Sequence, residues 1–315
     1  MAKVNRNSLR LDADFTEDTV GFAIEAFLAV LSFPRHRFTV EPFSRSKERW
    51  LGADARLLGH RIRGFRPFYM QFKRPSAYPD LSGAKVITDR KKLGLSVAPR
   101  SLFFPLRNKT VNQKCYQHNV LFKLQRRLSK HNLGNAAYVC PLFLDRSAYR
   151  LHLHLEALAR WPRFWRTRPW DLEDVLMDAG GRTIKFDRIP VLAEHISIPP
   201  HDEVKNAKHN YSFDEAGKYL CFHSPKALPD GSSSLAEFLK KIAYDFLGEN
   251  GKIAPDNAYQ ALRKLTDLGE EEESILPEIP PFSPDDPIGS WLSWGELLRQ
   301  QYDIEQYAFV SWDDL

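Results

Sequence analysis

Two strand-like stretches of this chain carry polar residues whose types and spacing suit hydrolysis of a phosphate ester. In PFYMQFKR, residues 67–74, the alternation of a strand places Gln71 and Lys73 together on the face opposite the apolar side chains. Asp54 lies 17 residues before Gln71, in the stretch GADARLLGH. Carboxylate and amide oxygens bind hard divalent cations, and a nearby lysine can orient or deprotonate a water molecule. The alternatives are a lysine that protects a sheet edge and an aspartate that belongs to a turn.

Glu25 is a third candidate, because it is the only charged residue between positions 19 and 34. This apolar stretch predicts most of a helix at 17–31. A carboxylate in such surroundings is costly unless it is paired, protonated or bound to a metal. The small residues Gly21 and Ala29 lie one turn away on either side and would let a strand approach closely. The alternative is a glutamate at the helix edge, with its carboxylate in solvent.

These residues need a scaffold, and the order of the predicted elements supplies one. A helix at 17–31 precedes strands at 37–43, 52–60 and 67–74, which are followed by a helix at 112–131 and a strand at 135–143. RIRGF is expected to turn between the second and third strands. The segment 75–111 is rich in proline, glycine and basic residues, and we expect a long irregular excursion there.

The rest of the chain predicts further strands and helices and an acidic end. The expected strands lie at 183–187 and 217–223, and the expected helices at 233–247, 255–267 and 289–303. The stretch LGEEEESILPEIPPFSPDDP has the composition of a linker. We therefore expect three segments: a core at 1–145, a companion region extending it at 146–267, and an acidic, proline-rich linker with a terminal helix at 268–315.

The order α-β-β-β-α-β, with Glu25, then Asp54, then QFK at 71–73, resembles the PD-(D/E)XK nuclease superfamily. The resemblance covers residues 15–145. It implies an α/β (mixed α+β) fold: a restriction-endonuclease-like core with a C-terminal helical extension and an acidic tail. One departure concerns Gln71, because most members carry Asp or Glu at that position and the amide removes a charge from the metal site.

The resemblance also implies the roles of particular residues. The ligands of Mg²⁺ or Mn²⁺ would be Asp54, Glu25 and the main-chain carbonyl of Phe72. Lys73 would be the catalytic lysine, and Gln117, near the start of the second helix, would help at the phosphate or the attacking water. The implied catalytic set is Glu25, Asp54, Gln71, Lys73 and Gln117.

The charge of the chain is unevenly distributed, which bears on its partner. Residues 34–131 hold 23 lysines and arginines against 5 acids, whereas residues 268–315 hold 1 against 12. Such a basic block indicates a polyanion, most often nucleic acid; the alternative is a solvated face or one that docks the acidic tail. The residues expected to contact DNA are Arg74, Arg90, Lys91, Lys92, Lys123, Arg126 and Arg127.

We therefore expect a metal-dependent DNA endonuclease, and the habits of the resembled family suggest prokaryotic defence against foreign DNA. The alternative is a catalytically weak or inactive protein of the same fold that binds nucleic acid or serves as a scaffold. The acidic tail is expected to cover a basic surface and restrain DNA binding, or else to dock a partner protein. A dimer is expected, because double-strand cutting usually needs two sites. Three widely spaced cysteines and the lack of a long apolar run predict a soluble, cytoplasmic protein without a membrane segment.

Overall fold

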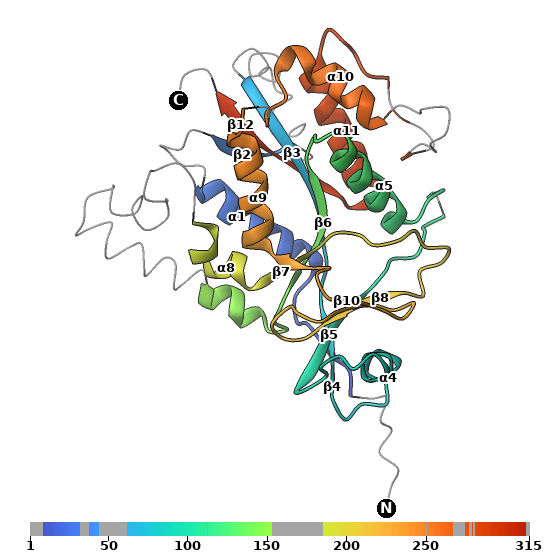
Figure 1. Ribbon diagram of the computed structural model, residues 1–315. Coiled ribbons are helices and arrows are strands. Elements are labelled where there is room, and N and C mark those ends of the chain that lie inside the picture. Colours follow the sequence, from blue (N-terminus) through green and yellow to red (C-terminus); the bar gives the residue numbers. More distant parts are fainter. Residues whose placement is uncertain are drawn as a thin grey trace, which may run out of the picture.

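The computed structural model describes residues 9–31, 38–43, 62–111, 113–152, 185–249, 251–266, 275–276, 279 and 281–312. Within these ranges the chain is a mixed α/β protein with two six-stranded sheets (Figure 1). The strand order of the first, here called the central sheet, is β11-β7-β6-β3-β12-β2. The order of the second sheet is β1-β4-β5-β8-β9-β10, with all neighbours antiparallel.

The bounds of the elements are as follows. The strands of the central sheet are β2 (Thr39–Pro42), β3 (Ile62–Phe72), β6 (Asn135–Pro141), β7 (His195–Ile198), β11 (Ser233–Ser234) and β12 (Glu305–Trp312). Those of the second sheet are β1 (Leu11–Asp12), β4 (Ser76–Pro79), β5 (Arg100–Pro105), β8 (Asn210–Phe213), β9 (Leu220–Phe222) and β10 (Lys226–Leu228). The helices are α1 (Glu17–Leu31), α4 (Lys85–Lys92), α5 (Gln117–Lys130), η3 (Phe186–Arg188), α8 (Pro190–Ala193), α9 (Leu235–Leu247), α10 (Pro255–Thr266) and α11 (Pro287–Tyr302).

Strand β3 lies in the interior of the central sheet and is buried on both faces. It pairs in parallel with β6 on one edge and antiparallel with β12 on the other. Phe68 and Met70 belong to the apolar core on one side of the sheet, and Phe65 and Tyr69 to the core on the other. The predicted alternation along this strand is thus observed, but the face of Gln71 and Lys73 is covered by protein and does not form a protected sheet edge.

Two layers of helices cover the central sheet (Figure 1). Helices α1, α8 and α9 contribute to the core that contains Phe68 and Met70. Helices α5, α10 and α11 contribute to the core that contains Tyr69, and the second sheet extends this core. Local signals explain where some helices begin. Ser234 and Glu237 form a capping box at α9, and Asp286 caps α11 ahead of Pro287.

Several sequence predictions need correction. The segment 75–111 contains β4, α4 and β5, so it is not an irregular excursion, and the expected turn RIRGF lies within β3 apart from its first residue, which is outside the described residues. Phe186–Arg188 is a short 3₁₀ helix where a strand was expected. The predicted strand at 52–60, with Asp54, lies outside the described residues. Over Phe68–Met70, β6 occupies one edge of β3 and β12 the other.

The C-terminal segment differs most from expectation. Its predicted helix is present as α11, but the chain continues into β12, which lies between β2 and β3 and pairs antiparallel with both. Seven of the eight residues of β12 are buried. The central sheet therefore draws strands from all three predicted segments. Residues 305–312 of the predicted tail are thus an interior strand, whereas the acidic run at 270–273 lies outside the described residues.

Candidate active site

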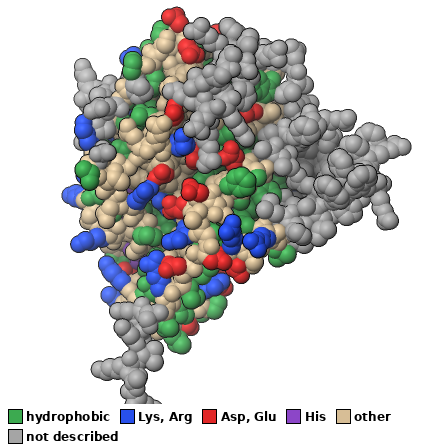
Figure 2. Space-filling model, turned by 180° about the vertical axis from the view of Figure 1, so that it is seen from behind, with side chains coloured by type: hydrophobic (Ala, Val, Ile, Leu, Met, Phe, Trp, Pro, Cys, Tyr) green, Lys and Arg blue, Asp and Glu red, His purple; other side chains and the backbone are tan. Residues whose placement is uncertain are grey.

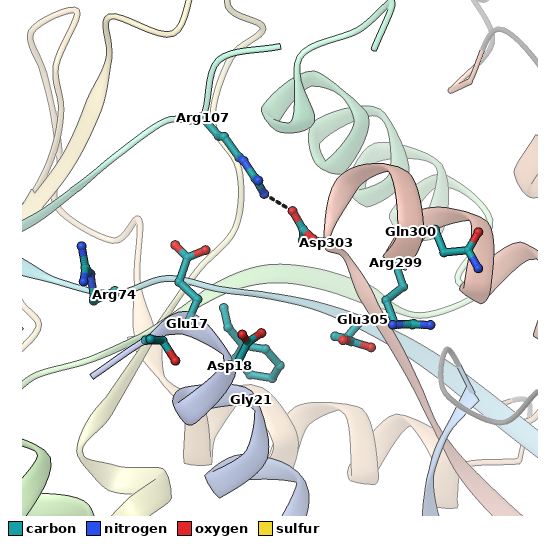
Figure 3. A pocket seen from close by; sticks show the side chains of 11 residues that line it. Glu17, Asp18, Gly21, Arg74, Arg107, Arg299, Gln300, Asp303 and Glu305 are labelled. Carbon is teal, nitrogen blue, oxygen red and sulfur yellow. Dashed lines mark hydrogen bonds and ion pairs between the residues drawn. The ribbon is translucent and has the colours of Figure 1, made fainter. Parts of the chain in front are cut away.

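A cavity of about 660 Å³ opens where β3 ends and β12 begins, beside the N-terminus of α1 (Figure 3). Five parts of the chain meet there: the start of α1, the end of β3, the segment after β5, the end of α11 and the start of β12. The residues that line it are Thr16, Glu17, Asp18, Gly21, Phe72, Arg74, Arg107, Arg299, Gln300, Asp303 and Glu305. Four carboxylates and three guanidinium groups thus face one space.

Lys73 lies directly after β3 and is almost fully buried; its chain neighbours Phe72 and Arg74 line the cavity, and Lys73 itself does not. Its backbone N–H donates to the carbonyl of Val139 at 2.8 Å, which holds it beside β6. Its Nζ donates to Oε1 of Gln117 at 3.2 Å and lies 3.8 Å from Oε1 of Glu17. Burial lowers the pKa of Lys73, and the carboxylate of Glu17 partly offsets this effect. The ammonium is therefore held by two partners from two different helices.

Gln71 and Gln117 both point at one backbone carbonyl. The Nε2 of Gln71 donates to the carbonyl oxygen of Tyr302 at 3.1 Å, and the Nε2 of Gln117 donates to the same oxygen. Both side chains are buried. The oxygen of the Gln71 amide, Oε1, is buried without a hydrogen-bond partner among the described residues. The amide of Gln71 thus serves the end of α11, and Gln71 does not line the cavity.

An ion pair crosses the mouth of the cavity. Arg107, in the segment that follows β5, donates to the carboxylate of Asp303 at the junction of α11 and β12 (Figure 3). About half of each side chain is exposed, so the pair is open to solvent. Arg74 also lines the cavity and is exposed. This side of the protein presents acids and bases together.

The structure separates Glu25 from the other predicted site residues. Glu25 lies on α1 two turns after Glu17, is half-buried, and does not line the cavity. Gly21, between them on the same stripe, does line it. The carboxylate of α1 near Lys73 is that of Glu17. The spacing of four residues from Glu17 to Gly21 to Glu25 was visible in the sequence, but an acid in a first turn reads as a helix-dipole residue.

Asp303 and Glu305 were missed because they lie in the segment expected to be a tail. A signal for them existed. The stretch IEQYAFVSW is rich in β-branched and aromatic residues, which is typical of a strand. Antiparallel pairing sets Glu305 opposite Met70 and brings the start of β12 to the end of β3. Phe72, whose carbonyl was a predicted metal ligand, also lines the cavity.

The donors around the cavity suit a hard cation in type. Mg²⁺ and Mn²⁺ bind oxygen ligands, and Mg²⁺ often takes one or two carboxylates together with water and substrate phosphate. Among the residues that the structure describes, no three His, Cys, Asp or Glu side chains are grouped closely enough to hold a metal ion. Asp54 falls outside those residues. The cavity therefore supplies the right kind of ligand in a sparse arrangement.

Two of the cations expected at a DNA surface are buried. Arg90 is fully buried and donates to the carbonyls of Ser96 and Tyr219 and to Oγ of Ser212. Arg127 is buried and donates to the carbonyl of Leu265. Both guanidinium groups satisfy buried oxygens, so their predicted contacts with DNA are corrected.

The remaining predicted cations are more accessible. Lys91, Lys92 and Arg126 are exposed, although Lys91 also donates to the carbonyl of Asp80. Lys123 is half-buried and lies 3.8 Å from a carboxylate oxygen of Glu203. Figure 2 shows acidic side chains near the middle of one face, with Lys and Arg side chains beside them. The basic residues are interspersed with acids on that face.

Comparisons with known proteins give this chain no relative. No family model, no curated protein and no solved structure matches it. In the described part of the chain, no helix combines the length and the apolar character that crossing a bilayer requires. Any function must therefore be argued from the site itself.

A second polar cluster, in the second sheet, has the connectivity of a nucleophile, a base and an acid. Oγ of Ser212 lies 2.8 Å from Nε2 of His223, and Nδ1 of His223 lies 3.2 Å from Oδ2 of Asp89. Ser212 is fully buried, and Arg90 donates to its oxygen. Because Asp89 and Arg90 both belong to α4, these contacts join α4 to the sheet.

Proposed function

We propose that the protein is a metal-dependent nuclease that hydrolyses phosphodiester bonds of DNA at the cavity beside Lys73. The observation that carries the proposal is the position of this lysine. It is a buried ammonium at the end of an interior strand, hydrogen-bonded to Gln117 and 3.8 Å from Glu17, which lines a cavity together with other acids and arginines. A buried cation contributes little to stability, and buried ionisable groups near a cavity are common at catalytic sites.

The side chains around the cavity divide the work that this reaction needs. Lys73 has a lowered pKa because it is buried, so it can exchange a proton more readily than an exposed lysine and can offset charge on a phosphate. Arg74 and Arg107 can bind phosphate oxygens. One or two of the acids that line the cavity, together with water and substrate phosphate, would hold the cation. Bound Mg²⁺ or Mn²⁺ would supply Lewis acidity and an activated water.

The arrangement of elements supports the resembled core in part. The described elements α1, β2, β3, α5 and β6 occur in the expected order, with β4, α4 and β5 inserted between β3 and α5, and β3 and β6 run parallel. The place between β2 and β3, where that order would put the strand at 52–60, holds β12. We propose a restriction-endonuclease-like core in which the C-terminal strand supplies part of the site.

Cleavage of plasmid DNA with Mg²⁺ or Mn²⁺ tests the proposal. The wild type should cut, and Lys73→Ala and Glu17→Gln should lose most of the activity. Asp54→Ala tests the carboxylate that only the sequence assigns. Lys240→Ala, an exposed lysine on α9, is a matched control that should leave activity unchanged. Equal cleavage by the wild type and Lys73→Ala, in preparations free of other nucleases, would refute the site.

A second candidate is a protein of this fold that binds nucleic acid without cutting it. Two observations favour it: the amide of Gln71 is engaged by Tyr302, and the described residues offer no group of three metal ligands. Binding would then rest on exposed cations such as Lys91 and Lys92 and would weaken steeply with salt. DNA binding by the wild type, with no cleavage under any divalent cation, would select this candidate.

A further inference from the structure

The end of α11 is held by side chains from two other elements. Tyr302 is the last residue of α11, and the final carbonyls of a helix have no partner within the helix. Nε2 of Gln71 on β3 and Nε2 of Gln117 on α5 both donate to the carbonyl of Tyr302. The next residue, Asp303, has a left-handed backbone with φ of 51° and points its carboxylate at Arg107. The two amides thus fix the point where the chain turns into the cavity.

Gln117 also holds Lys73, through the other end of the same amide. Its Oε1 accepts from Nζ of Lys73 at 3.2 Å while its Nε2 donates to Tyr302. Lys73, Gln117 and Tyr302 therefore form one buried chain across β3, α5 and α11. Gln71, two residues before Lys73 and within β3, donates to the same carbonyl of Tyr302.

We propose that Gln71 and Gln117 are positioning residues that lock the Lys73 ammonium to the junction of α11 and β12. This lock fixes the position of the Lys73 ammonium relative to Asp303 and Glu305, which line the cavity. The inference rests on the proposed function for its catalytic meaning, but the coupling itself is a property of the fold. It gives Gln71 a task other than binding metal.

Replacing Gln71 by Glu separates the two roles. A carboxylate cannot donate to the carbonyl of Tyr302, so Gln71→Glu breaks the lock and should lower kcat about tenfold or more, as misplacement of catalytic groups does. If position 71 instead bound metal, Gln71→Glu would add a charged ligand and would keep or raise activity. The two readings predict opposite signs for one substitution.

Amide hydrogen exchange tests the lock without using activity. The backbone N–H of Asp303 donates to a carbonyl one turn earlier in α11 at 2.9 Å, so its exchange rate reports how firmly the end of this helix is held. Gln71→Leu and Gln117→Leu each remove one donor from the carbonyl of Tyr302 and should speed this exchange about tenfold or more. Gln260→Leu, an exposed glutamine on α10, is the control and should leave the rate unchanged.

The outcomes separate this inference from the proposed function. An Asp303 exchange rate that stays the same in both leucine variants overturns the inference even if the wild type cuts DNA. Unimpaired cleavage by Gln71→Glu overturns it as well. Faster exchange in both variants, in a wild type that cuts nothing, supports the lock and removes the nuclease. If Gln117→Leu fails to fold, Gln71→Leu decides alone.

Discussion

Substitution of Lys73 by Met should separate activity from stability. Lys73 is 3% exposed, so its ammonium has lost nearly all its contact with water. Replacement of a buried ionic group by an apolar side chain of similar volume is often neutral or stabilising by about 1–4 kcal/mol. Against this gain, Oε1 of Gln117 loses its donor, which costs about 1–3 kcal/mol for a buried acceptor. Glu17 is 45% exposed, so water can hydrate its carboxylate when the ammonium is removed, and the loss of this contact costs little stability. The free energy of unfolding should therefore change by no more than about 2–3 kcal/mol in either direction.

The pH dependence of stability gives this prediction a sign. Burial places the folded-state pKa of Lys73 below its usual 10.5. Between these two values the unfolded chain binds more protons than the folded chain, so wild-type stability gains from this lysine as pH rises toward 10.5. Lys73→Met should lack that gain and should have lost cleavage. Urea denaturation at several pH values, paired with a plasmid assay, checks both. A variant destabilised by well over 3 kcal/mol, or one that still cuts, would refute the reasoning.

Three further predictions concern other charged groups. Arg107→Ala should weaken DNA binding, Asp303→Asn should strengthen it, and the double variant should resemble Arg107→Ala. Because the ion pair is half exposed, the free energy of unfolding should change by about 1 kcal/mol or less in each variant. Lys92→Ala should leave stability unchanged and should reduce the salt dependence of DNA binding by about one phosphate contact. Arg90→Ala should destabilise the protein by about 2–4 kcal/mol, because buried oxygen atoms then lose their hydrogen-bond donor. Burial lowers the pKa of His118 from 6.5 to about 4. Between these two pH values the unfolded chain binds more protons than the folded chain, so stability should fall as the pH drops from 6.5 to about 4. Thermal unfolding should show a smaller fall in His118→Gln.

The sequence predicted the elements that local signals specify. The bounds of α1 match the expected helix at 17–31, and α11 begins at Pro287 behind a capping aspartate. Strand β3 follows its alternation. The strand β12 was missed because the acidic, proline-rich stretch before it suggested a linker. Pairing of β12 with β3 joins residues more than 230 positions apart, and no local pattern reports such a contact.

The candidate site was predictable where it depends on β3 and α5. Lys73 and Gln117 were chosen from the sequence, and the structure joins them with a hydrogen bond. Glu17, Asp303 and Arg107 were not chosen, because their relevance comes from tertiary contacts at the ends of elements. Arg90 and Arg127 show the reverse error. Basic composition predicts surface charge, but these guanidinium groups satisfy buried carbonyls.

The presence of Gln at position 71 follows from the location of α11. The C-terminal end of a helix carries partial negative charge and exposes carbonyls that need donors. In this protein that end is buried against β3, so a carboxylate at position 71 would face the carbonyl of Tyr302 with no hydrogen to give. An amide can donate there. The same chain end then brings Asp303 and Glu305 to the cavity. The amide at position 71 and the acids that β12 brings to the cavity are thus two consequences of one packing arrangement.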